Sequence, residues 1–299
     1  MSILPYRWLG TILTPVCSRI TNEKKIVGTI EEIDKIIHKY RPDELIVALN
    51  RNAKQENQEE VIKKLYHYFL PIKIVGSDFT PSFGYIQMNN LMTRPYTELP
   101  PEYVPSEYLI VKNISDRFFA LLLLILLTPL FGWIAAMIWR KEGIPILYRQ
   151  TRIGYKGKSF TLYKFRTMIP DAERDLPLLS GKEDNRITRT GSFLRKHRLD
   201  ELPQLFNVLR GEMSFIGPRP ERDYYIQTIV ENHPEYYLLQ RVKPGITSLG
   251  MVKYGYADSV EKMIKRSTYD LIYLRNINPV MDLRIIFYTL KTIAVGKGI

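Results

Sequence analysis

The feature that most constrains this chain is an apolar run in its middle. The residues from Phe118 to Trp139 are apolar throughout, apart from Thr128. Within the run, Pro129 and Gly132 are the positions that disfavour a regular helix. The run is 22 residues long, and about 20 apolar residues suffice to cross the hydrocarbon core of a bilayer. Because it lies in mid-chain, it is not a signal peptide, and the sequence predicts a membrane segment.

Its proline and its flanks indicate how this run meets the membrane. Pro129 removes one backbone hydrogen bond near the centre, and the hydroxyl of Thr128 can replace part of the lost bonding. Basic residues lie on both sides of the run: Lys112 and Arg117, then Arg140 and Lys141. Positive charge at both ends favours a re-entrant helix that breaks at Thr128-Pro129 and returns to the cytoplasmic face. A straight or kinked span is the alternative.

The composition limits the partners of the chain. A formal net charge of +12 calls for an anionic partner, such as nucleic acid, an anionic membrane surface or a phosphorylated substrate. The apolar run favours the last two, and no nucleic-acid-binding module is recognisable. Cys17 is the single cysteine, which excludes an internal disulfide and a cysteine-based zinc site. The four histidines lack metal-ligand spacing, and only His197, three residues before Asp200, keeps a candidate role.

Residues 25–75 alternate between strand-like and helix-like patterns. β-Branched runs at 25–27, 45–49 and 72–75 are separated by helical patterns, the second of them at 59–69. The first helical pattern begins with the capping box of Thr29 and Glu32, and isoleucines follow at helical spacing: Ile30, Ile33, Ile36 and Ile37. The order predicts a βαβαβ unit with a small parallel sheet. Since no G-x-G-x-x-G follows the first strand, we expect a regulatory or scaffolding domain rather than a dinucleotide site.

The prolines between residues 76 and 110 predict an irregular connection and a linker, with a domain boundary near 105–112. We therefore expect an α/β N-terminal domain with its linker over 1–111. A membrane-associated domain is expected over 112–299, mainly α-helical with a few short strands, and its re-entrant helix over 113–141. The last amphipathic segment, 282–293, is expected to pack as a helix on its own domain, with contact to the membrane surface as the alternative.

Two short segments concentrate charge that suits phosphate chemistry. The first, Arg198 to Pro203, places Asp200 and Glu201 just before a proline that fits the first turn of a helix, where backbone N–H groups favour phosphate. The second, Gly217-Pro218-Arg219-Pro220, holds an arginine between two prolines that restrict its backbone. In isolation, the first segment would be a charged helix start and the second a linker.

The sequence from about residue 112 to the end resembles the bacterial sugar transferases, also called polyprenyl-phosphate hexose-1-phosphate transferases or monotopic phosphoglycosyl transferases. The resemblance rests on ordered blocks: the apolar run broken at Thr128-Pro129, then 149–154, 163–168, 193–195, 199–205, 211–214, 217–220 and 243–247. The N-terminal part is similar to the nucleotide-fold-like domain of the larger members, which usually follows several membrane helices. Those helices are not in this sequence, so we expect a short form or a part of a longer chain.

The resemblance implies a reaction. The family transfers sugar-1-phosphate from a UDP-sugar to polyprenyl (undecaprenyl) phosphate and releases UMP, as the first membrane step of exopolysaccharide, capsule or O-antigen biosynthesis. It implies a covalent aspartyl-phosphosugar, with Asp200 as nucleophile and Glu201 as ligand to Mg²⁺. It also implies the bacterial inner membrane, with both soluble parts on the cytoplasmic face. The residue types agree, since a carboxylate nucleophile divides the exchange into two steps while metal and arginine neutralise the diphosphate.

Several residues are expected to bind the diphosphate, the nucleotide or the polyprenyl phosphate: Arg219 with its flanking Pro218 and Pro220, and also Lys164, Arg166, Arg195 and Arg152. A homodimer is left open. Many members carry Trp-Ala-Gln-Val-Asn-Gly-Arg after the Pro-Gly-Ile-Thr block, whereas this chain has a different sequence from Ser248 to Tyr256, which leaves the sugar open. The alternative function is a catalytically silent, membrane-anchored scaffold or regulator of a glycan assembly complex.

Overall fold

The computed structural model describes residues 11–13, 26–48, 55–75, 85–87, 96–99, 106–170, 172, 179 and 184–295. By its internal contacts the chain divides into two compact units, Met1–Tyr103 (unit 1) and Val104–Ile299 (unit 2). The division lies next to the interval 105–112, in which the prolines predict a domain boundary.

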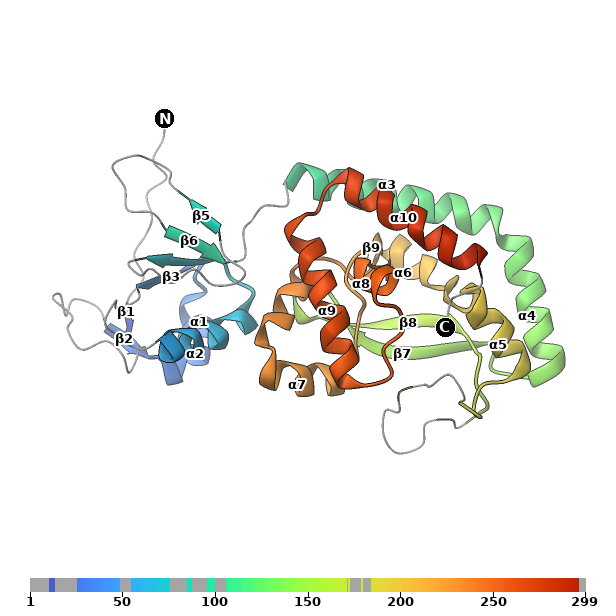
Figure 1. Ribbon diagram of the computed structural model, residues 1–299, viewed down its shortest axis with the longest axis horizontal. Helices are drawn as coiled ribbons and strands as arrows, with labels where there is room; N and C mark the ends of the chain where they lie inside the picture. The colour runs from blue at the N-terminus through green and yellow to red at the C-terminus, as the bar shows by residue number, and fades with distance from the viewer. Residues whose placement is uncertain are drawn as a thin grey trace. The chain divides into compact units, whose positions relative to one another are not determined.

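Unit 1 combines short helices with a small mixed sheet (Figure 1). The sheet has the order β3-β4-β6-β5, in which β3 and β4 are parallel and the other two pairs are antiparallel. Strands β1 and β2 pair with each other in a separate two-stranded sheet. The described elements are β1 (Thr11–Leu13), β2 (Ile26–Thr29), η1 (Ile30–Glu32), α1 (Ile33–Tyr40), β3 (Leu45–Ala48), α2 (Gln55–Leu65), η2 (Tyr66–Tyr68), β4 (Ile72–Val75), β5 (Tyr85–Gln87) and β6 (Tyr96–Leu99).

The sequence predicted part of this unit. The predicted helix start is confirmed, because the backbone N–H of Thr29 donates to Glu32 Oε2 at 3.4 Å and Ile30, Ile33 and Ile36 are buried. Strands β3 and β4, which α2 connects in the chain, pair in parallel, as a βαβ unit requires. The prediction of one parallel sheet is wrong, because β2 pairs with β1 and the proline-rich connection contributes β5 and β6. Strands β5 and β6 have only three and four residues, so they fit between prolines. Such short strands show no sequence pattern that would predict them or their pairing partners.

Unit 2 is mainly helical, as predicted, with two small two-stranded sheets (Figure 1). Strands β7 and β8 form a long antiparallel hairpin, and β9 and β10 pair in parallel. The elements are α3 (Ser106–Leu126), α4 (Thr128–Glu142), β7 (Leu147–Ile153), η3 (Tyr155–Gly157), β8 (Ser159–Phe165), α5 (Arg189–Lys196), η4 (Leu199–Glu201), α6 (Gln204–Arg210), β9 (Ser214–Ile216), α7 (Asp223–Asn232), η5 (Pro234–Arg241), β10 (Gly245–Thr247), α8 (Leu249–Lys253), α9 (Val260–Arg275) and α10 (Pro279–Ala294).

The apolar run forms two helices rather than one. Helices α3 and α4 meet at Leu127 with a bend of 62°. Pro129 has no N–H to donate to the carbonyl of Ile125, which is the physical reason for a break here. The hydroxyl of Thr128 donates to the carbonyl of Leu124 at 2.8 Å, so it restores part of the bonding as the sequence predicted.

The outer side of α3 is apolar and exposed. Large side chains there are about half to two-thirds accessible: Ile110, Val111, Ile114, Phe118, Phe119, Leu121, Leu122, Ile125 and Leu126. Trp133 and Trp139 continue this exposed apolar surface on α4. Within the described part of the chain, no helix alone has the length and apolar character of a membrane span, and the bent pair of α3 and α4 has them together. So large an exposed apolar surface is unusual for a protein surrounded by water.

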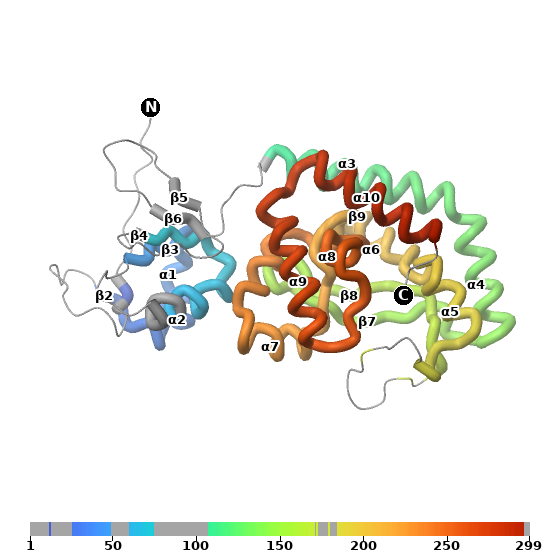
Figure 2. The backbone as a smooth tube through the Cα atoms, viewed as in Figure 1, coloured from blue at the N-terminus to red at the C-terminus, as the bar shows by residue number. Residues whose placement is uncertain are grey.

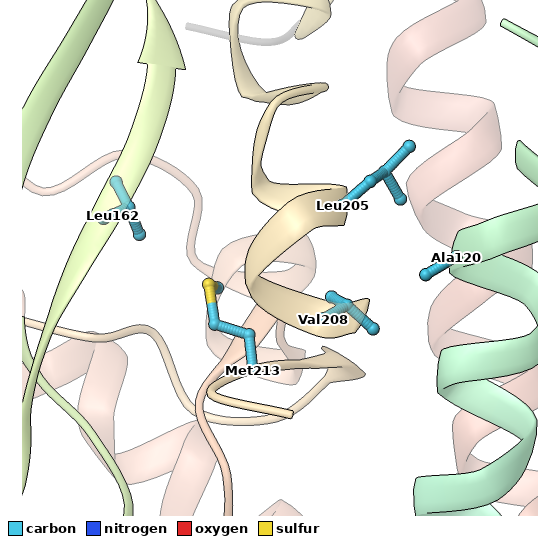
Figure 3. Packing of buried hydrophobic residues seen from close by; sticks show 5 residues of the cluster. All are labelled: Ala120, Leu162, Leu205, Val208 and Met213. Atoms are coloured by element: carbon cyan, nitrogen blue, oxygen red, sulfur yellow. The ribbon is translucent and has the colours of Figure 1, made fainter. Parts of the chain in front are cut away.

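The inner side of α3 packs on the hydrophobic core that holds the helix α6. Figure 3 shows Leu205 and Val208 of α6 on the side turned to Ala120 of α3, with Leu162 of β8 and Met213 on the other side. Because residue 120 is an alanine with no exposed surface, α6 approaches α3 closely. This core packs α6 between α3 and the β7–β8 hairpin. It thereby also positions the turn η4, which immediately precedes α6.

Helix α10 packs on the same unit, as predicted for the final segment. It runs beside α3 (Figure 2), and Asp282 of α10 accepts hydrogen bonds from Tyr108 and Lys112 of α3. Ile285 is buried in a core with Tyr273 of α9 and Ile216 of β9. The opposite side of α10 exposes apolar residues at helical spacing: Val280, Leu283, Phe287 and Leu290.

Candidate active site

The two carboxylates singled out in the sequence lie side by side in a buried turn. Asp200 and Glu201 belong to η4, and each is only 7% exposed. Pro203 lies just before α6, so the predicted helix start is correct. The backbone N–H groups of Glu201 and Leu202, which belong to η4, donate to the carbonyls of Arg198 and Leu199, both at 3.3 Å, and the contribution of the helix N–H groups stays a prediction. Side-chain cations lie against the negative charge in this turn.

Three cations surround Glu201. Lys164 Nζ of β8 lies 3.1 Å from Oε1, and Arg219 Nη1 lies 3.5 Å from the same oxygen. On the other side, Arg198 Nη2 lies 3.0 Å from Oε2. Lys164 and Arg219 were predicted as site residues, and the fold brings them to one carboxylate. Arg198 was not, although it lies within the quoted motif, because sequence alone does not show which way its side chain turns.

This environment gives the two carboxylates different acidities. Burial raises the pKa of Asp200, and the nearby Lys164 only partly offsets this. Burial acts in the same direction on Glu201, but Arg198, Lys164 and Arg219 outweigh it and hold the pKa of Glu201 well below its ordinary value. Glu201 is thus ionised at neutral pH and forms ion pairs with the three cations around it. Asp200 is the less stabilised carboxylate, which suits a nucleophile.

The Pro-Arg-Pro segment is held from both sides. The parallel pairing of β9 with β10 brings Gly217 so close to Lys243 that a Cβ at residue 217 would lie 2.2 Å from the Lys243 carbonyl oxygen. The backbone N–H of Arg219 points at Asp270 Oδ2 at 3.5 Å. Pro218 and Pro220 are buried, so they act by restricting the backbone of Arg219.

The other predicted cations converge on the same pocket, which has a volume of about 550 Å³. Arg152 donates to the carbonyl of Pro220 at 3.1 Å and forms an ion pair with Glu221 at 3.3 Å. Arg195 Nε donates to Thr167 Oγ1 at 2.8 Å. Arg166 donates to the carbonyls of Glu142 and Gly143 at 2.6 and 3.0 Å, so part of its guanidinium holds the end of α4. His197 does not line this pocket, and its ring lies 5.1 Å from that of Phe193.

The segment that departs from the family pattern also lines the pocket. Met251 and Tyr256 both belong to its wall. The sulfur of Met251 lies 3.4 Å from Arg219 Nη1 and 3.8 Å from Arg198 Nη2. Gly250 is fixed by Asp270, whose Oδ1 accepts its N–H at 2.7 Å. The sequence predicted neither Asp270 nor its role, because it lies on α9, far along the chain.

Whether a metal ion fits here depends on the donor set. The described residues contain no group of three His, Cys, Asp or Glu side chains that could hold an ion by themselves. Mg²⁺ typically takes one or two carboxylates and completes its coordination with water and substrate phosphates. Glu201 Oε2 is buried and makes no hydrogen bond, so it has capacity for a further ligand. The residues therefore fit Mg²⁺ in combination with a phosphate-bearing substrate.

The buried carboxylate pair, its surrounding cations and the exposed apolar helix pair all lie in the part of the chain that matches a family model. The chain belongs to the bacterial sugar transferase family, whose model matches residues 107–296.

Several curated relatives are similar over much of this chain. A UDP-N-acetylgalactosamine-undecaprenyl-phosphate N-acetylgalactosaminephosphotransferase from Aeromonas hydrophila is 33% identical over 78% of this chain and 53% of its own length. A UDP-glucose:undecaprenyl-phosphate glucose-1-phosphate transferase from Klebsiella pneumoniae is 40% identical over 64% of this chain and 41% of its own length. The exopolysaccharide production protein PSS from Rhizobium leguminosarum bv. phaseoli is 38% identical over 64% of this chain and 98% of its own length. The chain thus spans about half the length of the first two, whose names specify different sugars.

Proposed function

We propose that this chain transfers sugar-1-phosphate from a UDP-sugar to undecaprenyl phosphate, with release of UMP, through an aspartyl-phosphosugar intermediate. The observation that carries the proposal is the buried pair of Asp200 and Glu201 in a pocket with more cations than anions. The names of the relatives support the reaction class. A silent scaffold would retain no benefit from such a pocket, because burying surplus charge costs free energy unless a ligand compensates it.

In the first step, a carboxylate oxygen of Asp200 attacks the phosphorus that carries the sugar, and the bond from this phosphorus to the UMP oxygen breaks. Arg219 and Lys164 lie where they can bind the diphosphate and offset the charge on the departing UMP. In the second step, an oxygen of undecaprenyl phosphate attacks the same phosphorus and frees Asp200. When bound, Mg²⁺ would be held by Glu201 and the phosphates, and it would supply further charge neutralisation.

Substitution of Asp200 tests this proposal. Asp200→Asn keeps the volume of the side chain but removes the nucleophile, so we expect UMP release from a panel of UDP-sugars to fall by about three orders of magnitude or more. The matched control is Asp223→Asn, on the exposed start of α7, which should keep activity. Without undecaprenyl phosphate, a labelled sugar phosphate should remain on the wild-type protein only. Normal turnover by pure Asp200→Asn protein would exclude Asp200 as the nucleophile.

We also propose that α3 and α4 form a re-entrant hairpin in the bacterial inner membrane, with both units on the cytoplasmic face. The exposed apolar side of α3, the 62° bend and the basic residues at both flanks support this arrangement. Single cysteines in place of the exposed Lys35 and Thr268, in a Cys17→Ser background, report the side of each unit. Both should resist an impermeant thiol reagent until the cells are opened. Labelling of one position alone in intact cells would show a span instead.

A further inference from the structure

Arg198 combines an unfavourable backbone conformation with a position in the pocket. Its φ of 55° and ψ of 23° lie in the left-handed region, which side chains with a Cβ rarely adopt. Among the described residues other than glycine, Arg41, Phe69 and Lys156 share a positive φ, and none of these lines the pocket. The conformation places the side chain of Arg198 over η4, where it is only 14% exposed.

Arg198 and the other two cations use different oxygens of Glu201. Lys164 and Arg219 both approach Oε1, at 3.1 and 3.5 Å, whereas Arg198 alone approaches Oε2, at 3.0 Å. Oε2 is also the buried oxygen that makes no hydrogen bond. It is therefore the oxygen with capacity for a metal ion, and it is the one that Arg198 covers. The sulfur of Met251 lies 3.8 Å from the same nitrogen, Arg198 Nη2.

A divalent ion and the Arg198 guanidinium are incompatible at this oxygen. Mg²⁺ binds carboxylate oxygens at about 2.0–2.1 Å, so the ion would lie within a few ångströms of the guanidinium, where like charges repel strongly in a buried site. Lys164 and Arg219 add to this repulsion. A diphosphate reverses the balance, because it brings negative charge and offers acceptors to a guanidinium.

We propose that Arg198 is a counter-ion that occupies the metal-binding oxygen of Glu201 until the donor arrives, so that a divalent cation enters the site only together with a diphosphate. On binding, Arg198 leaves Glu201 for the phosphates, and Glu201 becomes available to the ion. This inference rests on the proposed function only in taking a diphosphate as the ligand. It makes Arg198 a residue that sets the order of binding.

The test uses the full chain in detergent and measures Mn²⁺, a paramagnetic substitute for Mg²⁺, by the electron paramagnetic resonance signal of the unbound ion. UDP serves as the diphosphate, with a UDP–Mn²⁺ titration without protein as the reference. For the wild type, we expect UDP to tighten Mn²⁺ binding more than tenfold. Arg198→Asn should bind Mn²⁺ without UDP at least tenfold more tightly than the wild type does, and Glu201→Gln in the same background should remove this gain. Asparagine tolerates the left-handed conformation, so the turn is retained.

The matched control is Arg195→Gln, which removes one positive charge from the same pocket but not from Glu201, because Arg195 donates to Thr167. An equal gain for Arg195→Gln would show an effect of net charge and overturn the proposal. Tight Mn²⁺ binding by the wild type without UDP would overturn it, as would an absence of Mn²⁺ binding in every variant. None of these readouts needs turnover, so failure of the Asp200 mechanism would be seen separately in the UMP assay.

Discussion

Among the buried charged side chains of unit 2, two clusters differ in how their charges are balanced. In the first, which we name the α3–α10 cluster, Asp282 accepts from Lys112, from Tyr108 at 2.8 Å and from Tyr273 at 2.7 Å. One carboxylate thus meets one ammonium and two hydroxyl groups. The second is the pocket cluster around Glu201, where one carboxylate meets three cations.

The two clusters also differ in what remains unsatisfied. Both oxygens of Asp282 have hydrogen-bond donors, whereas in the pocket the buried Nε and Nη1 atoms of Arg166 make no hydrogen bond, and Glu201 Oε2 makes none beside its ion pair with Arg198. Buried polar groups in native proteins are almost always satisfied, so such exceptions call for an explanation. A balanced, closed cluster fixes one helix against another. Under the function that we propose, an anionic ligand completes the cluster with surplus cations.

The largest expected effect on stability comes from breaking the closed cluster. Asp282→Asn leaves the ammonium of Lys112 buried without its counter-charge, which should lower the free energy of unfolding by about 3–5 kcal/mol. Thermal unfolding in detergent would show this as a lowered midpoint. The double variant Lys112→Met with Asp282→Asn should recover part of the loss, since both charges of the ion pair are then removed, while the nearby Asp116 keeps the hydrogen bond from Ser214 but loses the favourable charge of Lys112. An unchanged midpoint for Asp282→Asn would show that the cluster is not a structural element.

The opposite result is expected in the pocket. Arg219→Lys keeps the charge but loses the two-pronged guanidinium, so kcat/KM for the UDP-sugar should fall about 100-fold, which corresponds to about 3 kcal/mol. The midpoint of unfolding should hardly change, because the cluster has surplus cations without a ligand. Arg210→Lys, on an exposed arginine that stacks on Tyr163, is the control and should keep its activity. A large loss of stability with unchanged kcat/KM would assign Arg219 to the fold instead.

The sequence predicted the features that depend on residues close in the chain. The bend at Thr128-Pro129 follows from one missing N–H, and the restricted backbone of Arg219 follows from its two neighbouring prolines. The meeting of Lys164, Arg198 and Arg219 on Glu201 depends on tertiary packing. Motif recognition supplied Lys164 and Arg219 in advance, but it gave no signal for the contact of Arg198 with Glu201.

The unpredicted residues are those whose partners lie far away in sequence. Asp270 reaches Gly250 and Arg219 from α9, and Asp282 reaches Lys112 across 170 positions. Their helices show an apolar periodicity, but a buried carboxylate within them has no local signature. The same limit explains β5 and β6, whose short sequences between prolines reveal no pairing partner.

Asp270 provides the test with the smallest expected effect. It is a buried carboxylate in the pocket wall, and it is held by backbone N–H groups rather than by the cations around Glu201. Burial raises the pKa of Asp270 to about 6, against which the N–H of Gly250 acts only partly. The folded protein therefore keeps this proton up to a pH of about 6, whereas the unfolded chain releases it near 4. Between these two pH values the folded state binds more protons than the unfolded chain, so the free energy of unfolding falls as the pH rises. Above a pH of about 6 this contribution no longer changes.

The expected size of this fall is at most about 3 kcal/mol, from a shift of about two pKa units. Asp200, whose pKa is also raised, adds to the fall in the wild type, so the comparison is made with Asp270→Asn, which keeps Asp200 and lacks only the Asp270 contribution. Unfolding midpoints between pH 4 and 7 should therefore decline less steeply in the variant than in the wild type. The variant also retains one oxygen for the N–H of Gly250, so it should fold. Parallel pH profiles would mean that Asp270 does not carry its proton in the folded state and that the pocket wall is held by an ionised carboxylate.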